Sequence, residues 1–536
     1  MGPPRSSAAA TIRELTLGLP GSASGSAELT RLLYREKLGQ PFHLELEFTS
    51  PAPAVDPGEM LGHGLDVGIV LPDGGMRHLH ALVSEVSRLD GQPAGGLFSY
   101  RVVAEPWLGL LRLRRWSRWF HRKHAIEILE AVFKATGQSA YENLTLEPSP
   151  SRDFCAQFGE TDLDFVQRTM QRDGIYHFWR HARGGHTLVL CDSFANHGPF
   201  PGAGSLPYDP DPTAAAVGEF LTSWSFRHSL TTEAITSDDY HYESAATSPA
   251  ATEKVLGVSS LSGSVEYRFP AGVTSHAEAV RDARLRGEIL AAEAAVHLGT
   301  TNSLKVSAGF LVHVDKFPAT GENGDYLVTS ATLEIDAAGD DEESHGFTHR
   351  CTFEAIPAAR QFRPRRTVEK PRAVGMHPAF VHAPDGHPAW QPYSDVSARL
   401  QVTTPWNRGG DPSCWVRVSQ LLAGDRWGAL HLGRAGNEVL VAYEHDDIDR
   451  PVIVGCVYNS SNRPPVDMPL AAGISIIKDP SGNYVSLNPI PAEPTITISS
   501  PWKATSVMIG GSHSNESSIG LGALKHEAQE AMSDVG

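Results

Sequence analysis

Residues 154–179 read FCAQFGETDLDFVQRTMQRDGIYHFW, and in this stretch a helix pattern passes directly into a strand pattern. The Thr161 hydroxyl can cap amides of the first helical turn, and Asp162 and Asp164 suit the positive end of the helix dipole. Gly174 supplies the stop signal. The expected buried stripe has helical spacing: Leu163, Val166 and Met170. The stretch therefore predicts a helix that is followed at once by a strand.

Strand patterns with period two surround this stretch. In residues 40–50, QPFHLELEFTS, every second side chain is apolar, which predicts a half-buried strand. Similar patterns are separated by turn sequences such as PDGG and RHARGG. They occupy residues 67–71, 78–86, 98–103, 175–179, 187–190, 304–314 and 326–335. The N-terminal part is therefore predicted to hold β meanders or small barrels.

Two further helices are expected in this part of the chain. Residues 125–135 carry apolar side chains at helical spacing, and Gly137 can cap their C-terminal end. Residues 275–297 are alanine-rich, with Ser275 opening a capping box and Gly299 expected to close the helix. The predicted fold class is mainly β with a few helices.

A change of composition marks a domain boundary near residue 360. Residues 360–376 are basic, proline-rich and without apolar pattern, which indicates an extended linker between residues 1–359 and a domain at residues 377–466. Five short strand patterns in that domain suit a small barrel of the OB type. They lie at residues 397–402, 414–419, 428–432, 438–443 and 452–457.

The last part of the chain consists of short alternating pieces. ISII, YVSL, TITI and SVMI occur within residues 467–510, separated by glycine and proline, and resemble rungs of β structure that cannot bury a face alone. Residues 511–536 form a polar tail. Only about sixty residues follow Gly473, so a C-terminal β-prism or β-helix is expected to be short, with no room for a fused toxin domain.

Composition and charge exclude several classes of protein. The formal net charge is −17 and no Lys/Arg-rich block is present, so nucleic acid is not an expected partner. The five cysteines are widely spaced, which fits neither a disulfide framework nor a zinc ribbon and suits a reducing cytoplasm. The N-terminus lacks the apolar core of a signal peptide, and no run of about 18 apolar residues is found. Export is expected by a route that needs no signal peptide.

Several histidines and carboxylates are candidates for metal binding or acid/base catalysis. His177, His181 and His186 could in principle meet, as could His121 and His124, but neither HExxH nor a cysteine at ligand spacing accompanies them. Ordinary surface histidines are the expected interpretation. Asp162 and Asp164, two apart on a helix, point to different sides, so capping is favoured over acid/base catalysis.

Other candidate sites also have structural interpretations. The acidic run DAAGDDEE at residues 336–343 lacks the spacing of a calcium loop and is expected to be solvated. Residues 21–25, GSASG, have alanine where a nucleophile would be needed, and no P-loop is present. Residues 363–366 could form a binding patch, but a solvated linker that touches the acidic body is the simpler interpretation. For the three tryptophans, core packing or subunit contact is favoured over a ligand surface: Trp406, Trp415 and Trp427. No catalytic, cofactor-binding or metal residue is predicted.

Several segments, taken in order, resemble the VgrG spike proteins of type VI secretion, which are related to phage tail hubs. Residues 154–179 and the following HTLVLCDS at residues 186–193 are similar to the most recognisable part of that family. YRVVAEPWLGLL at residues 100–111 matches upstream, and CWVRVSQ and DRPVIVG match downstream in the OB region. Departures occur at Gly159, which replaces a longer side chain, and at residues 398–402, ARLQV, where the family has a GRVKV-like strand.

The resemblance implies a homotrimer without enzyme activity. It implies two tail-hub-type β-barrel units per chain that form a ring of six on a hexameric Hcp-like tube, an OB domain, and a prism bearing a PAAR-type tip. Baseplate components and effectors or their adaptors are further implied partners. The assembly would form in the cytoplasm and cross a target membrane mechanically. Two alternatives remain: a phage or tailocin tail hub, and a secreted cell-wall hydrolase.

Overall fold

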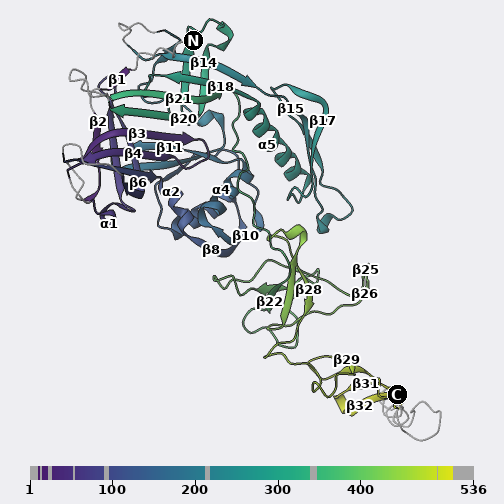
Figure 1. Cartoon of the computed structure of the whole chain (residues 1–536). Coiled ribbons are helices and arrows are strands. Elements are labelled where there is room, and N and C mark those ends of the chain that lie inside the picture. Colours follow the sequence, from purple (N-terminus) through teal and green to yellow (C-terminus); the bar gives the residue numbers. More distant parts are fainter. Residues whose placement is uncertain are drawn as a thin grey trace. The chain divides into compact units, whose positions relative to one another are not determined.

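A computed structural model describes residues 10–12, 15–21, 27–51, 55–89, 96–211, 218–337, 347–491 and 493–510 of the 536-residue chain. The chain divides into two compact units, Met1–Pro371 and Arg372–Gly536. Strands dominate both units, with a few helices in the first (Figure 1). The prediction of a mainly β chain is confirmed. Among the described residues, no helix is both long enough and apolar enough to cross a membrane.

The first unit is built on a 13-stranded sheet. Its main path runs β14-β18-β21-β20-β3-β4-β7-β6-β5-β2. β3 pairs antiparallel with β20, so the two β-rich regions that were expected as separate barrel units share one continuous sheet. The path strands are β2 (Leu15–Gly18), β3 (Glu28–Lys37), β4 (His43–Ser50), β5 (Gly64–Val70), β6 (Met76–Arg88), β7 (Phe98–Glu105), β14 (Leu221–His228), β18 (Ala295–Thr301), β20 (Gly324–Ala337) and β21 (Phe347–Pro357). β1 (Ala10–Ile12), β13 (Ser205–Pro207) and β19 (Leu311–Asp315) pair beside this path.

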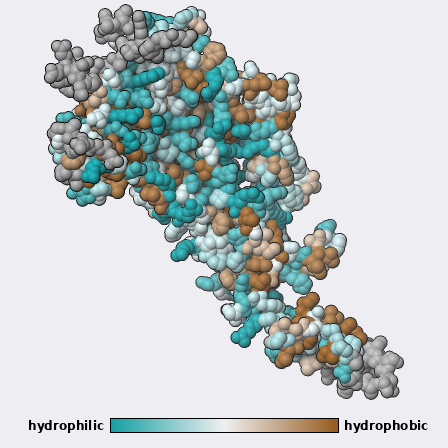
Figure 2. All heavy atoms as spheres, viewed as in Figure 1, coloured by the Kyte–Doolittle hydropathy of each residue, from teal (hydrophilic) through white to brown (hydrophobic). Residues whose placement is uncertain are grey.

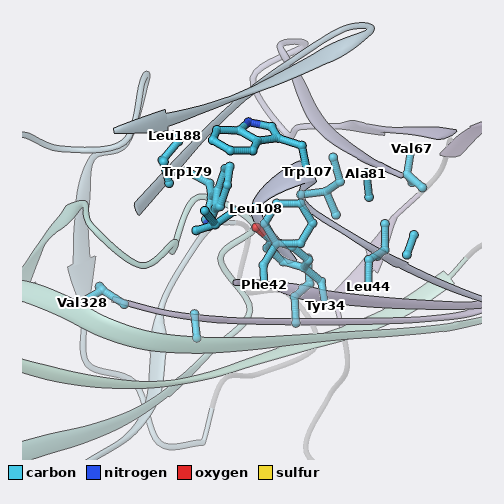
Figure 3. Packing of buried hydrophobic residues seen from close by; sticks show 14 of the residues in the cluster. Tyr34, Phe42, Leu44, Val67, Ala81, Trp107, Leu108, Trp179, Leu188 and Val328 are labelled. Atoms are coloured by element: carbon cyan, nitrogen blue, oxygen red, sulfur yellow. The ribbon is translucent and has the colours of Figure 1, made fainter. Parts of the chain in front are cut away.

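The apolar alternation of β4 explains how this sheet acquires its core. Leu44, Leu46 and Phe48 have no exposed surface, whereas the residues between them are half-buried. Just before the strand, Phe42 packs edge-to-face against Trp179, with ring centroids 5.4 Å apart (Figure 3). Burying one face of a strand and solvating the other is the arrangement that period-two patterning predicts.

Smaller elements cover the first unit. α1 (Pro57–Met60), α2 (Trp107–Leu110), α3 (Ala125–Ala135) and α4 (Asp162–Asp173) are accompanied by a pair of strands, β8 (Arg115–Lys123) with β10 (Arg152–Thr161), and by a three-stranded sheet of β9 (Tyr141–Asn143), β11 (Tyr176–Ala182) and β12 (Gly185–Cys191). The helices predicted at residues 125–135 and after Thr161 are confirmed. The Thr161 hydroxyl accepts the Asp164 N–H at 3.0 Å, and Gly174 ends the helix with a φ of 72°. Phe165 is fully buried and Leu163 only half-buried, so the buried stripe differs by one member from the prediction.

The prediction that a helix extends to residue 297 is wrong at its C-terminal end. α5 (His276–Ala294) gives way directly to β18, although Ser275 caps its start as predicted by accepting the Glu278 N–H. Gly299 lies inside β18, where a Cβ atom would stand 2.4 Å from the Phe353 ring. The glycine therefore permits close packing within the sheet and ends no helix. The strand expected from residue 304 likewise begins only at β19.

α5 packs beside a separate three-stranded sheet in the order β16-β15-β17 (Figure 1). These strands are β15 (Thr231–Ser237), β16 (Ala251–Lys254) and β17 (Ser260–Arg268). Charged groups hold the helix to the sheet: Arg286 forms a bidentate pair with Glu266 at 2.9 and 3.0 Å, and Arg268 donates to Asp282 at 2.6 Å. These ion pairs stand beside a small apolar contact, in which Ala283 and Ala291 of the helix pack against Ile235 of β15 and Val255.

The second unit begins with a five-stranded sheet in the order β23-β22-β27-β28-β24. Its strands are β22 (His377–His382), β23 (Gln401–Thr403), β24 (Arg417–Val418), β27 (Glu438–Tyr443) and β28 (Pro451–Cys456). β22 was not predicted. The strand predicted at residues 397–402 starts later, because Ala398 has a φ of 57°, which an extended strand does not allow.

The strand predicted at residues 428–432 does not join this sheet, which corrects the expectation. Instead β26 (Trp427–Gly428) pairs with β25 (Ala423–Gly424) in a separate hairpin. Leu430 is 65% exposed, so the short apolar alternation at this point does not face the core of the domain.

The chain continues into a four-stranded antiparallel sheet formed by consecutive strands. These are β29 (Ser475–Lys478), β30 (Tyr484–Asn488), β31 (Thr495–Ser500) and β32 (Thr505–Gly510). The four pieces predicted as β rungs are thus confirmed as strands. The polar tail at residues 511–536, most of the acidic run at 336–343 and most of the GSASG stretch lie outside the described residues.

Candidate functional site

The C-terminal sheet carries one apolar face and one largely polar face. The register places Ile477, Val485, Ile498 and Val507 opposite one another across all four strands. A second row on the same face runs Leu487, Ile496 and Ile509. On the opposite face stand Ser486 and Thr497, flanked by Ile476 and Met508. The sheet is therefore amphipathic, as its period-two patterning requires.

Nothing in the described part of the second unit covers this apolar face. Ile477 is 65% exposed and Ile498 is 52% exposed, although both lie within paired strands. An open depression of about 430 Å³ lies on this sheet and is lined mostly by apolar atoms. Figure 2 shows apolar residues on this part of the surface. Exposed apolar patches of this kind mark surfaces that bind another protein. This face is the candidate functional site.

The first unit contains a chain of hydrogen bonds through histidine rings. His181 Nδ1 accepts the backbone N–H of His80 at 3.1 Å, so the neutral ring carries its proton on Nε2 and donates it to the Tyr34 hydroxyl at 2.9 Å. Tyr34 in turn donates to the Glu36 carboxylate at 3.1 Å. This chain joins β3, β6 and β11.

A second chain of hydrogen bonds begins at α2. His186 Nε2 accepts the backbone N–H of Trp107 at 3.1 Å, so its proton lies on Nδ1 and is donated to His80 Nδ1 at 2.8 Å. Burial is the main cause of a lowered pKa at both rings. The pKa of His186 falls to about 3, and that of His181 falls well below its usual value. Neutral rings are what both chains of hydrogen bonds need.

The expectation of ordinary surface histidines is wrong for this group. His177 has no exposed surface and His186 only 5%. They are buried because the hairpin β11–β12 turns one face, with Trp179 and Leu188, onto the core of the first unit (Figure 3). The partners Tyr34, His80 and Trp107 were missed, since only the tertiary fold brings these separate segments together.

Metal binding is not supported by this geometry. Across the described ranges, no three His, Cys, Asp or Glu side chains are grouped so that they could hold a metal ion. His124 serves as the N-cap of α3 and contacts the Ser149 carbonyl oxygen at 2.6 Å. His121 packs against the Phe154 ring, with centroids 5.6 Å apart. These two histidines have separate structural roles.

Comparison with known families follows the same division of the chain. Residues 35–339 match the family described as the phage tail baseplate hub (GPD), which is more than half of the 536 residues. The chain belongs to the phage tail baseplate hub family. Residues 393–458 match the type VI secretion system/phage-baseplate injector OB domain. An OB domain in the second unit is therefore confirmed.

Relatives in the hub family include spike proteins of type VI secretion. The chain is 30% identical to VgrG1c of Pseudomonas aeruginosa over 451 residues, which cover 83% of this chain and 61% of that protein. It is 29% identical to VgrG1a of the same organism over 461 residues, which cover 84% and 71%. The chain thus spans about three-fifths of the length of the first relative. The predicted resemblance to VgrG spike proteins is confirmed.

Solved structures agree on the fold. A type VI secretion component of E. coli, described as similar to the T4 bacteriophage tail proteins gp27 and gp5, aligns with a TM-score of 0.59 at 21% identity, covering 83% of this chain and all of that one. A chain of the lidded Francisella PdpA–VgrG complex aligns with a TM-score of 0.62 at 8% identity, covering 94% and 80%. At these identities the likeness concerns the fold.

The paired carboxylates take part in stabilising this hub fold. Asp162 is fully buried and accepts hydrogen bonds from Gln157 at 2.8 Å and Arg118 at 3.1 Å. Asp164 accepts the Thr161 hydroxyl at 2.6 Å. The two carboxylates therefore bind different partners and do not converge on one substrate position.

The basic linker is tied to the first unit from its start. Arg363 is 5% exposed, and it donates to the Glu288 carboxylate at 2.6 Å and to the Asp192 carbonyl at 2.7 Å. Arg366 donates to Asp282 at 2.7 Å. The expected contact with acidic groups is confirmed, whereas the expectation of a solvated stretch is wrong for Arg363.

The three tryptophans of the second unit differ in environment. Trp415 packs against Tyr393 with ring centroids 5.2 Å apart, and Trp406 is half-buried. Trp427 is 67% exposed, so core packing is excluded for it, and both subunit contact and a ligand surface remain open.

Proposed function

We propose that three copies of this chain form the spike of a type VI secretion apparatus. The spike would cap a hexameric Hcp-like tube, dock on baseplate components, carry a PAAR-type tip with effectors or their adaptors, and be driven through a target membrane when the apparatus contracts. Its work is mechanical and needs no catalytic residue. The VgrG relatives support a role in type VI secretion. The hub and OB domains support a place for the spike at the end of the tube.

The main support for a trimer is the amphipathic C-terminal sheet. One apolar row, from Ile477 through Val485 and Ile498 to Val507, crosses every strand and is open to solvent in the single chain. Three such sheets would bury these rows against one another as a three-sided prism. Burial of apolar area would then stabilise the assembly by roughly 25 cal/mol per Å².

We also assign a role in the spike to each region of the chain. Residues 1–359 would form the tube-binding region, 360–376 the connection, 377–466 the OB domain that narrows the assembly, and 467–510 the prism. Assembly would take place in the cytoplasm, before the apparatus itself exports the spike.

The native mass of the purified full-length protein tests the trimer. We expect about three times 57.9 kDa. A stable monomer at micromolar concentration contradicts the spike assembly.

Loss of the gene should abolish export of the tube protein in a strain with an active type VI system. Normal export contradicts the proposed role. A phage or tailocin hub is the second candidate, favoured by the phage hub family match, and release of the chain within phage-like particles would identify it.

A further inference from the structure

A basic run stands out in the first unit. Residues 106–126 contain no Asp or Glu, and within them residues 112–123, RLRRWSRWFHRK, carry five arginines and one lysine in a chain whose formal net charge is −17. This run corrects the expectation that the chain has no Lys/Arg-rich block. It takes in the end of the short 3-10 helix Leu111–Leu113 and all of β8, which pairs with β10 in a ribbon close to α4 (Figure 1). The exposed surface of residues 112–123 is called the basic ridge below.

Few carboxylates neutralise the basic ridge. Arg112 pairs with Glu105. Arg114 and Arg118 share one buried carboxylate, that of Asp162, at 3.1 Å each. The other three cations form no ion pair within the described part of the chain: Arg115, Arg122 and Lys123. The ridge therefore keeps an excess of positive charge on the surface of an acidic protein.

The basic ridge also exposes apolar side chains between its charges. Leu113 is 76% exposed and Trp116 is 38% exposed. Arg114 lies over the Trp116 ring, with its guanidinium carbon 5.4 Å from the ring centroid. Exposed leucine and tryptophan flanked by arginines are typical of segments that lie in a membrane interface. There the apolar groups enter the headgroup region, and the long cationic side chains stay at the level of the phosphates.

We propose that the basic ridge binds the surface of an anionic phospholipid membrane. Its cations without ion pairs lie at both ends of β8, Arg115 at the start and Lys123 at the end, roughly 25 Å apart at the rise of a strand. This spacing suits an extended charged surface better than a single acidic side chain. A nucleic acid fits less well, because it would stack bases on open aromatic faces, and Arg114 already covers one face of Trp116. The contact belongs to the first unit and does not depend on the proposed trimer.

Flotation of the full-length protein with lipid vesicles tests this contact. The vesicles consist of equal parts of phosphatidylcholine and phosphatidylglycerol, and vesicles of phosphatidylcholine alone are the neutral comparison. We expect the protein to float with the anionic vesicles only, although its own net charge is −17. Added salt should release it, because salt screens the attraction between exposed charges.

A triple variant removes the cations that have no ion pair. Arg115→Gln, Arg122→Gln and Lys123→Gln together should lower the partition coefficient on anionic vesicles by about a hundredfold, or about fivefold for each charge removed. Leu113→Ser should also weaken binding without any change of charge, because it removes an exposed apolar group. Circular dichroism is measured for each variant before flotation.

A matched control removes three exposed cations from other parts of the first unit: Arg88→Gln, Arg183→Gln and Lys254→Gln. It has the same net charge as the ridge variant and should bind anionic vesicles nearly as well as the parent protein. An equal loss in both triple variants would show that overall charge decides binding, which overturns the assignment to the ridge.

Two further results overturn the proposal. One is a parent protein that does not float with anionic vesicles, or floats equally with neutral ones. The other is binding of a short DNA duplex in place of vesicles, which would make the ridge a nucleic-acid site. Native mass is measured in parallel, so that a monomer that binds anionic vesicles contradicts the proposed spike and leaves the membrane contact standing.

Discussion

At the scale of single residues, the buried histidines differ in how well their nitrogens are satisfied. His181 and His186 each use both ring nitrogens, whereas neither nitrogen of His177 has a hydrogen-bond partner within the described structure. A buried polar group without a partner costs about 1–3 kcal/mol. His177 is therefore a position where the fold accepts a loss of stability.

We expect His177→Leu to stabilise the first unit by about 1 kcal/mol, because an apolar side chain of similar size removes that cost. The thermal unfolding midpoint should rise. His63→Leu, at an exposed position, should leave it unchanged and serves as the control. A lower midpoint for His177→Leu would contradict the absence of a hydrogen-bond partner for this imidazole.

Stability should fall in acid through the same histidines. Burial lowers the pKa of His177 and of His186 from 6.5 to about 3. Between these values the unfolded chain binds more protons, so the stability is complete above pH 6.5 and decreases as the pH falls towards 3. Unfolding midpoints measured across this window should decline, and less steeply in His177→Leu. A flat profile contradicts the burial of neutral rings.

At the scale of elements, the end of α4 depends on one glycine. Gly174 has a φ of 72°, and a Cβ atom there would lie 2.6 Å from Leu285. Gly159 also has a positive φ, of 60°, but a Cβ atom would meet nothing within 4 Å. Replacing either glycine by alanine would strain a left-handed backbone. Only at Gly174 would the added Cβ atom also clash with a neighbouring side chain.

Gly174→Ala should therefore destabilise the protein by more than the matched Gly159→Ala. We expect about 1 kcal/mol for Gly159→Ala from the left-handed backbone, and about 2–3 kcal/mol for Gly174→Ala. Denaturant unfolding monitored by circular dichroism measures both. Equal losses would mean that Leu285 moves aside without cost.

At the scale of the whole molecule, the apolar row of the C-terminal sheet should decide assembly. Ile498→Ser places a hydroxyl in the centre of that row, whereas Thr497→Ser changes the neighbouring residue on the opposite face. Ile498→Ser should shift the trimer towards monomer in light scattering at micromolar concentration, because each copy loses its buried side chain at the shared axis. Thr497→Ser should remain trimeric. A fully trimeric Ile498→Ser protein would show that other contacts suffice.

Local patterns in the sequence were enough for the strands of the C-terminal sheet, for β4 and for α3 and α4, because side-chain period and caps act within a few residues. Local patterns failed at the junction of α5 with β18. The alanine-rich sequence there is compatible with a longer helix, but residues from Ala295 onward form a strand because they pair with β14 and β21. They also failed for His177 and Arg363, whose burial depends on segments far along the chain.

Side-chain periodicity and the order of motifs were enough to predict the mainly β class, the order of hub and OB regions, and the apolar rungs that no single chain covers. Three features emerged only from the folded chain. The two N-terminal β regions share one sheet, the histidines are neutral and enclosed, and the hairpin carrying Trp427 stands apart from the OB sheet. This difference arises because the pattern of apolar residues shows only which side of a helix or strand avoids water. Which partner covers that side is settled by packing over long sequence separations.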